Sequence, residues 1–236
     1  MRLSRWENIV YEEELLGKFH VFKDRFEAGR LLGEASRTIV KSADYVLAIP
    51  MGGIPIGLEV SKSLNSKFDV IICRKLLIPW NREAGFGAVD PDGEYFIDED
   101  FSRSMGLSSS DINEAVREQV EEVRKRNYLL RKGKEYPSYD GLKIVLVDDG
   151  IAAGYTMTAA IKFVKSRGAK EVIKAVPTGC LESLVKLSRC VDLIVCLNVR
   201  TGPWFAVADA FVDWRDLNYE DVIKMLNSYE GKFESL

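Results

Sequence analysis

The sequence predicts an α/β protein with a doubly wound, mainly parallel five-stranded sheet that carries helices on both faces. Five short apolar runs have the length and composition of buried strands, at 45–49, 68–73, 144–147, 171–176 and 191–197. Segments with helical periodicity separate most of these runs, which is the pattern of βαβ units. Of the 236 residues, 47% are apolar, enough to fill one large core. We therefore expect residues 1–236 to form one domain.

The chain opens with an appendage followed by a helix. Residues 1–23 are expected to be only partly structured. The first helix should start near Asp24, because Asp24 and Glu27 have the spacing of a capping box. The first buried strand, Tyr45–Ile49, should come next.

A glycine-rich loop follows that first strand. Residues 50–57 contain three glycines and two prolines, more than a simple turn needs, so a ligand loop is favoured over an ordinary strand-to-helix turn. A helix should then run through Leu64. The next strand, 68–73, leads into Arg74 and Lys75. These two cations suit an anion site and a solvated pair equally well.

Residues 79–140 interrupt the βαβ rhythm. The turn sequence at 90–93, Asp-Pro-Asp-Gly, lies between two strand-like segments and predicts a hairpin. Capping residues at 108–111 then precede a long apolar stripe with dense charge opposite, which predicts a long amphipathic helix. We expect this region to be an insertion made of a flexible hairpin and a long helix.

The most informative stretch is 144–156, where a buried strand runs into Asp148 and Asp149. Open α/β sheets bind ligands at this end of their strands. Small residues follow, and the start of a helix at about Tyr155 supplies backbone N–H groups that suit a phosphate. Two carboxylates repel a phosphate but suit hydroxyls or a metal. A ligand with both a phosphate and a diol is a ribose 5-phosphate.

After the last predicted strand the pattern breaks, and residues 198–217 should form a small C-terminal hood. Trp204 and Phe205 stand beside a Gly-Pro pair there, and they suit a core position and a platform for a flat ring equally well. A closing helix is expected at 219–226.

Composition excludes several classes of function. The net charge is −3, the sequence pI is about 5.5 and there is no basic block, which argues against nucleic-acid binding. No apolar run is long enough to span a membrane, and the acidic N-terminal residues do not suit a signal peptide, so a cytoplasmic location is expected. The four cysteines form no C-x-x-C pair, and the single histidine, His20, lies outside every motif. Zinc and histidine-based catalysis are therefore not expected.

The blocks along this chain resemble those of the type I phosphoribosyltransferase family. Residues 148–156, preceded by four hydrophobic residues, resemble its signature for binding phosphoribosyl pyrophosphate (PRPP). Four other blocks resemble a prokaryotic subgroup of generically described phosphoribosyltransferases: 22–29, 50–57, Arg74-Lys75 with 87–89, and 205–213. The resemblance implies an enzyme that transfers the phosphoribosyl group of PRPP to a nitrogen of a nucleobase-like acceptor, with a purine slightly favoured.

The resemblance also implies roles for single residues. Asp148 and Asp149 would hold the ribose hydroxyls, directly or through a Mg²⁺-bound water, and Lys75 would join them as a catalytic residue. The 5-phosphate would be bound by Ala152, Ala153, Gly154, Tyr155 and Thr156. The pyrophosphate would be bound, next to a strained peptide, by Met51, Gly52, Gly53, Arg74 and Lys75.

The hood and the insertion have implied roles as well. Contacts to the base would come from Trp204, Phe205 and Val207, and Phe205 resembles the aromatic residue that stacks on purines in the 6-oxopurine enzymes. Asp213 resembles an acid on the metal side, so the implied Mg²⁺ ligands are Asp148, Asp149 and Asp213. Part of 79–140 would close over the site to exclude water. The expected partners are PRPP, a nucleobase-like molecule and a second copy in a homodimer.

Four positions depart from the family pattern. Met51 stands where arginine is usual, Ala153 replaces a common threonine, and Tyr155 is bulky where a small residue or lysine is usual. Ala152 is not acidic, so the carboxylate that serves as a base in the 6-oxopurine enzymes is absent at that position. These departures keep a second hypothesis open, a PRPP- or nucleotide-sensing module without turnover. A third is a doubly wound phosphate binder unrelated to PRPP.

Overall fold

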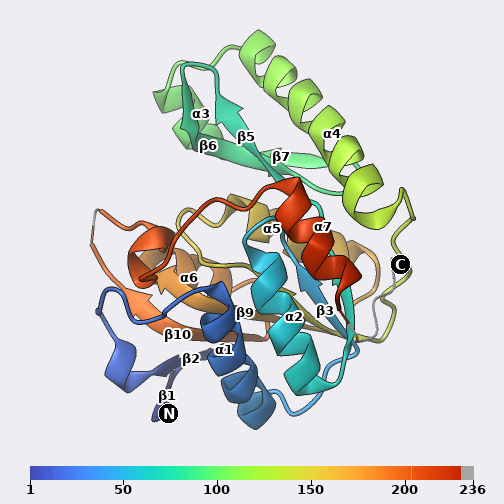
Figure 1. The fold of residues 1–236 in the computed structure, drawn as a ribbon. Helices are drawn as coiled ribbons and strands as arrows, with labels where there is room; N and C mark the ends of the chain where they lie inside the picture. Colours follow the sequence, from blue (N-terminus) through green and yellow to red (C-terminus); the bar gives the residue numbers. More distant parts are fainter. Residues whose placement is uncertain (203, 230–236) are drawn as a thin grey trace.

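The fold is built on one central sheet (Figure 1). The computed structural model describes residues 1–202 and 204–229, apart from the side chains of residues 82 and 83. The strand order is β1-β2-β10-β9-β8-β3-β4, and every pairing is parallel except that of β1 with β2. The strands are β1 (Leu3–Trp6), β2 (Ile9–Glu12), β3 (Tyr45–Ala48), β4 (Lys67–Val70), β8 (Lys143–Val147), β9 (Glu171–Cys180) and β10 (Leu193–Arg200).

The sheet has seven strands, so the expectation of five was two short. The additional strands, β1 and β2, come from the N-terminal appendage. Ile9 and Val10 of β2 pair with residues 194 and 195 of β10 and are 1% and 2% exposed. Such a short apolar pair carries little periodicity of its own, and it becomes a strand because it covers the open edge of β10.

Helices cover both faces of the sheet, as the sequence predicts. Along β8, Val145 and Val147 pack into one buried cluster, and Ile144 and Leu146 pack into the other, as the alternation of a strand requires. The first cluster is covered by α1 (Arg25–Ile39), α2 (Gly53–Leu64) and α7 (Tyr219–Asn227). The second is covered by α5 (Tyr155–Ser166) and α6 (Leu181–Ser188).

The insertion forms a separate three-stranded sheet with two helices, which stands beyond the C-terminal edge of the main sheet (Figure 1). The predicted hairpin and long helix are confirmed. Its elements are β5 (Arg74–Ile78), β6 (Asn81–Val89), β7 (Tyr95–Ile97), α3 (Glu99–Ser104) and α4 (Ser109–Arg131). The predicted strand at 68–73 is corrected, since β4 ends at Val70 and the two cations begin β5. Pairing of β5 with β6 lifts those residues out of the main sheet.

A buried ion pair joins the insertion to the main sheet. Arg131, the last residue of α4, donates from Nε and Nη2 to the two carboxylate oxygens of Asp69 on β4, at 3.0 and 2.8 Å. Both side chains are 1% exposed. The guanidinium also lies 3.5 Å from the ring centroid of Tyr136.

Within residues 1–202 and 204–229, no helix is both long and apolar enough to cross a membrane.

Candidate functional site

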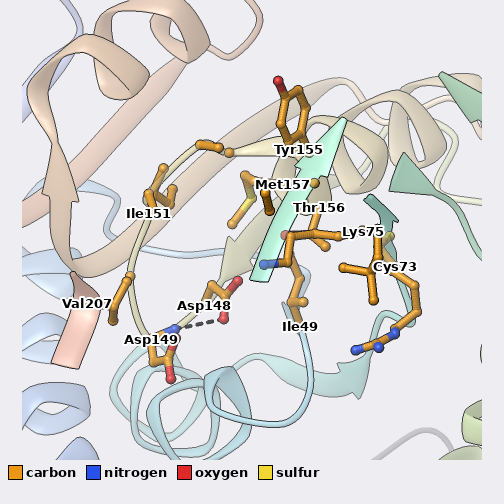
Figure 2. A pocket seen from close by; sticks show the side chains of 18 of the residues that line it. Ile49, Cys73, Lys75, Asp148, Asp149, Ile151, Tyr155, Thr156, Met157 and Val207 are labelled. Carbon is orange, nitrogen blue, oxygen red and sulfur yellow. Dashed lines mark hydrogen bonds between the residues drawn. The ribbon is translucent and has the colours of Figure 1, made fainter. Parts of the chain in front are cut away.

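A pocket of about 600 Å³ lies at the C-terminal end of β8, between the main sheet and the insertion. It brings together residues that the sequence places in three separate segments. Figure 2 shows the acidic pair at its floor, with Lys75 and Cys73 on one side and Val207 on the other. The predicted site residues that line it are Arg74, Lys75, Asp148, Asp149, Ala152, Ala153, Gly154, Tyr155, Thr156 and Val207.

The loop after β8 presents backbone to this pocket. Gly154 precedes α5 with φ of 79°, a conformation that strongly favours glycine, and a Cβ there would lie 2.8 Å from Leu187. In the described part of the chain, no side chain caps the start of α5. The first N–H groups of the helix are therefore left for a ligand, and the helix dipole favours an anion.

Tyr155 turns away from the acidic pair and contacts the insertion (Figure 2). Its hydroxyl donates to Asp98 at 3.0 Å, and its ring lies 6.3 Å from that of Phe96. Burial, together with that hydrogen bond, raises the pKa of Tyr155 to about 12. The side chain of Tyr155 therefore connects the loop after β8 to the insertion and does not fill that loop.

Asp148 and Asp149 are held in different ways. The backbone N–H of Asp149 donates to Asp148 Oδ1 at 2.9 Å, and Arg25 Nε donates to Asp149 Oδ2 at 2.9 Å. Burial raises the pKa of both carboxyls. The charge of Asp149 raises the pKa of Asp148 further, whereas Arg25 opposes the rise at Asp149. Asp149 is thus the carboxylate whose charge is balanced directly by Arg25.

The glycine loop at residues 51–53 packs closely against the acidic pair but does not line the pocket. A Cβ on Gly52 would overlap Asp149 Oδ2, and one on Gly53 would lie 2.9 Å from the carbonyl oxygen of Val147. The peptide bond before Met51 is cis, at the position where the resemblance places an unusual peptide. Only glycine at residue 52 permits this approach.

The two cations reach the pocket from β5. Arg74 is half-buried and donates to Gln119 of α4 at 3.2 Å, whereas Lys75 is exposed. Their position depends on the insertion and not on the main sheet, because β5 belongs to the insertion. The insertion also gives the pocket apolar lining from Leu77, Ala84 and Phe101, which the sequence did not single out.

The hood residues separate into two groups. Val207 lines the pocket and packs against Gly150. Trp204 is 89% exposed, and Phe205 lies 5.0 Å from the guanidinium of Arg200; neither lines the pocket. Asp213 is exposed and lines a neighbouring cavity of about 420 Å³. The structure therefore brings only one of these four residues to the pocket.

A buried lysine lies within the main sheet. Lys174 of β9 is fully buried, and its Nζ has no hydrogen-bond partner among the described residues. Burial lowers its pKa from the usual 10.5 to about 7, although the charge of Asp148 acts in the opposite direction. No local pattern pointed to this residue, because its neighbours on the strand are apolar.

We expect Lys174→Met to stabilise the protein most at low pH. Between pH 7 and pH 10.5 the unfolded chain binds a proton at Lys174 that the folded chain does not, so the stability of the parent protein rises with pH in this window. The advantage of the variant should therefore shrink by about 3 kcal/mol between pH 6 and pH 9. Urea unfolding at both values measures this. A gain in stability that is the same at both pH values would contradict this prediction. Lys224→Met, a change at an exposed lysine, serves as the control.

Comparison with known proteins places the chain in a recognised group of sequences. The sequence model named "Phosphoribosyl transferase domain" matches residues 24–207. Two Mycobacterium tuberculosis proteins, MT0597 of strain CDC 1551 and Rv0571c of strain H37Rv, are provisionally named phosphoribosyl transferases. Each is 33% identical over 213 residues, which are 90% of this chain and 48% of the relative. The chain thus spans about half the length of these relatives.

A solved structure extends the likeness to the fold. The crystal structure of TT1426 from Thermus thermophilus has a TM-score of 0.72 and 32% sequence identity. The match covers 89% of this chain and 99% of that one. The likeness therefore extends over most of the fold.

Proposed function

Because the chain belongs to the phosphoribosyltransferase family, we propose that it transfers the 5-phosphoribosyl group of PRPP to a nitrogen of a nucleobase-like acceptor. Pyrophosphate is the second product. The single observation that carries the proposal is the shared pocket of the acidic pair, the N-terminus of α5 and Lys75. Diol, phosphate and pyrophosphate of one molecule would each meet a group of suitable charge there.

The acidic pair fits a magnesium ion that is bound together with PRPP. One oxygen each of Asp148 and Asp149 accepts a hydrogen bond from the protein, which leaves a second oxygen on each. Among the described residues, no three of the usual metal-binding side chains come together. Mg²⁺ is commonly held by one or two carboxylates together with substrate phosphates and water, so this donor set suits it. When bound, Mg²⁺ would neutralise charge on the pyrophosphate.

The proposed reaction breaks the bond from C1 of the ribose to pyrophosphate and forms a bond from C1 to nitrogen. Positive charge develops on the ribose ring as the leaving group departs. Asp148 and Asp149 would stabilise that charge, and Lys75 would balance the charge of the departing group. The backbone at α5 would fix the 5-phosphate, so the nucleophile needs mainly positioning.

A second function, sensing of PRPP or a nucleotide without turnover, also has specific support. The carboxylates lining the described pocket are Asp148 and Asp149 alone, and Ala152 stands where the 6-oxopurine enzymes have a base. A sensor needs only the ribose and phosphate contacts. Transfer to an acceptor that loses its proton readily would need no such base. Turnover on acceptors of that kind therefore separates the enzyme from the sensor.

The experiment that tests transfer is pyrophosphate release with PRPP and Mg²⁺ across purines, pyrimidines and pyridine carboxylates. Release with at least one acceptor is expected, with purines tried first. PRPP binding by calorimetry without release on any acceptor would select the sensor. If the protein neither binds PRPP nor releases pyrophosphate, both functions are overturned.

We expect Gly52→Ala to weaken PRPP binding at least about tenfold, or about 1.4 kcal/mol. The added methyl would overlap Asp149 Oδ2 and displace that carboxylate from Arg25. Calorimetric titration with PRPP measures the effect, and an unchanged unfolding temperature shows that the fold is kept. Unaltered affinity would mean that Asp149 and this loop do not act together.

A further inference from the structure

Arg25 lines one cavity and donates to a residue that lines another. It lines the cavity of about 420 Å³ beside Asp213 and Trp214, and its Nε donates to Asp149 on the floor of the main pocket. The side chain of Arg25 is 9% exposed and that of Asp149 is 17% exposed. A partly buried ion pair of this kind is screened by salt less than an exposed one.

Three further contacts fix the guanidinium. It lies 3.7 Å from the ring centroid of Trp214 and 5.9 Å from that of Phe211. Its Nη1 donates to the carbonyl oxygen of Arg215 at 2.9 Å. The stack and the second hydrogen bond both come from residues 211–215, close to the end of the hood. One side chain at the first turn of α1 therefore joins the acidic pair to the hood.

Arg25 also lies on the glycine-loop side of Asp149. A Cβ on Gly52 would come within 3.1 Å of Arg25 Nε. Met51 supplies no charge on this side. Arg25 is thus a buried cation placed between the loop, the acidic pair and the hood.

We propose that Arg25 is a positioning residue for Asp149, which it holds aimed at the ribose site, and that the hood acts on the reaction through this contact. The proposal rests on the proposed function, since PRPP is the ligand whose hydroxyls Asp149 would meet. A planar guanidinium can stack on Trp214 while donating to two acceptors in different directions. Lysine supplies the charge but not this combination.

The test is a double-mutant cycle read by the affinity for PRPP in the presence of Mg²⁺. Arg25→Ala is expected to weaken PRPP binding about tenfold, and Arg25→Lys to recover part of that loss. Asp149→Asn alone should cost more. If Arg25 acts through Asp149, adding Arg25→Ala to Asp149→Asn should change the affinity less than twofold.

Arg167 offers a matched control. Its guanidinium donates to both oxygens of Asp92 at 2.9 Å and to the carbonyl of Tyr136 at 2.9 Å, and it lies 4.7 Å from the Phe163 ring centroid. Arg167→Ala therefore removes a similar set of contacts outside the pocket, and we expect PRPP affinity to stay unchanged. Unfolding temperatures of all variants report whether they fold.

The outcomes separate this proposal from the one it rests on. If the parent protein binds PRPP but the losses from Arg25→Ala and Asp149→Asn are additive, the role of Arg25 is overturned and the proposed function stands. An equal loss in Arg167→Ala would also overturn it, since the effect would then be one of general stability. Absence of PRPP binding by the parent protein would overturn the proposed function, and the role of Arg25 with it.

Discussion

Replacing Asp148 and Asp149 together with asparagine is expected to abolish pyrophosphate release and to weaken PRPP binding at least about a hundredfold, or about 2.7 kcal/mol. Asparagine keeps the size of each side chain but removes both negative charges. The groups proposed to accept from the ribose hydroxyls and to balance the positive transition state are then lost. Release of pyrophosphate and calorimetric titration with PRPP measure the two effects.

The fold should survive this double change. Burial and mutual repulsion raise the pKa of Asp148, so neutralising the pair removes an unfavourable interaction, and an amide oxygen at position 149 can still accept from Arg25. Asp92→Asn, which alters a carboxylate far from the pocket, provides the control and should keep full activity. Turnover that persists in the double variant would refute the role given to the acidic pair.

Replacing Arg131 with alanine is expected to lower the free energy of unfolding by about 3–5 kcal/mol. The change leaves Asp69 charged and buried, with both hydrogen bonds from the guanidinium lost. It also removes the side chain that packs on Tyr136 and bonds to Asn127 of α4. Urea unfolding monitored by circular dichroism gives the loss.

Two further variants distinguish the unpaired charge from lost packing. Combining Asp69→Leu with Arg131→Met replaces the pair with apolar groups, and the combination should be much less destabilising than Arg131→Ala alone. Lys224→Ala removes one half of an exposed ion pair with Glu220 and should have little effect. If Arg131→Ala proved as mild as Lys224→Ala, the ion pair would not anchor the insertion.

The elements that the sequence predicted best carry their own local signals. β8 is a continuous apolar run, and α4 has a capping box at Ser108 and Asp111 ahead of an apolar stripe, so both could be placed without knowledge of their neighbours. β2 has only two apolar residues that pair with β10, a strand at the other end of the sequence. Its formation depends on that distant edge, which no local pattern reveals.

The site shows the same division. Asp148, Asp149 and the loop to Thr156 are adjacent in sequence, and they line one pocket. Arg25 is separated from Asp149 by 124 positions, and its place after the capping Asp24 gives no sign of that contact. Trp204 was a candidate because of its neighbours in sequence, but the hood leaves it exposed. Contacts formed across the fold were therefore missed, and residues grouped along the chain were found.

The most direct measurement of the central claim is a calorimetric titration of the parent protein with PRPP and Mg²⁺, with ribose 5-phosphate and inorganic pyrophosphate titrated separately. The account predicts that PRPP binds at least about tenfold more tightly than either fragment, because the acidic pair, the α5 N-terminus and the cations of β5 each contact a different part of it. Binding of PRPP no tighter than pyrophosphate, and unchanged by Asp148→Asn with Asp149→Asn, would contradict it.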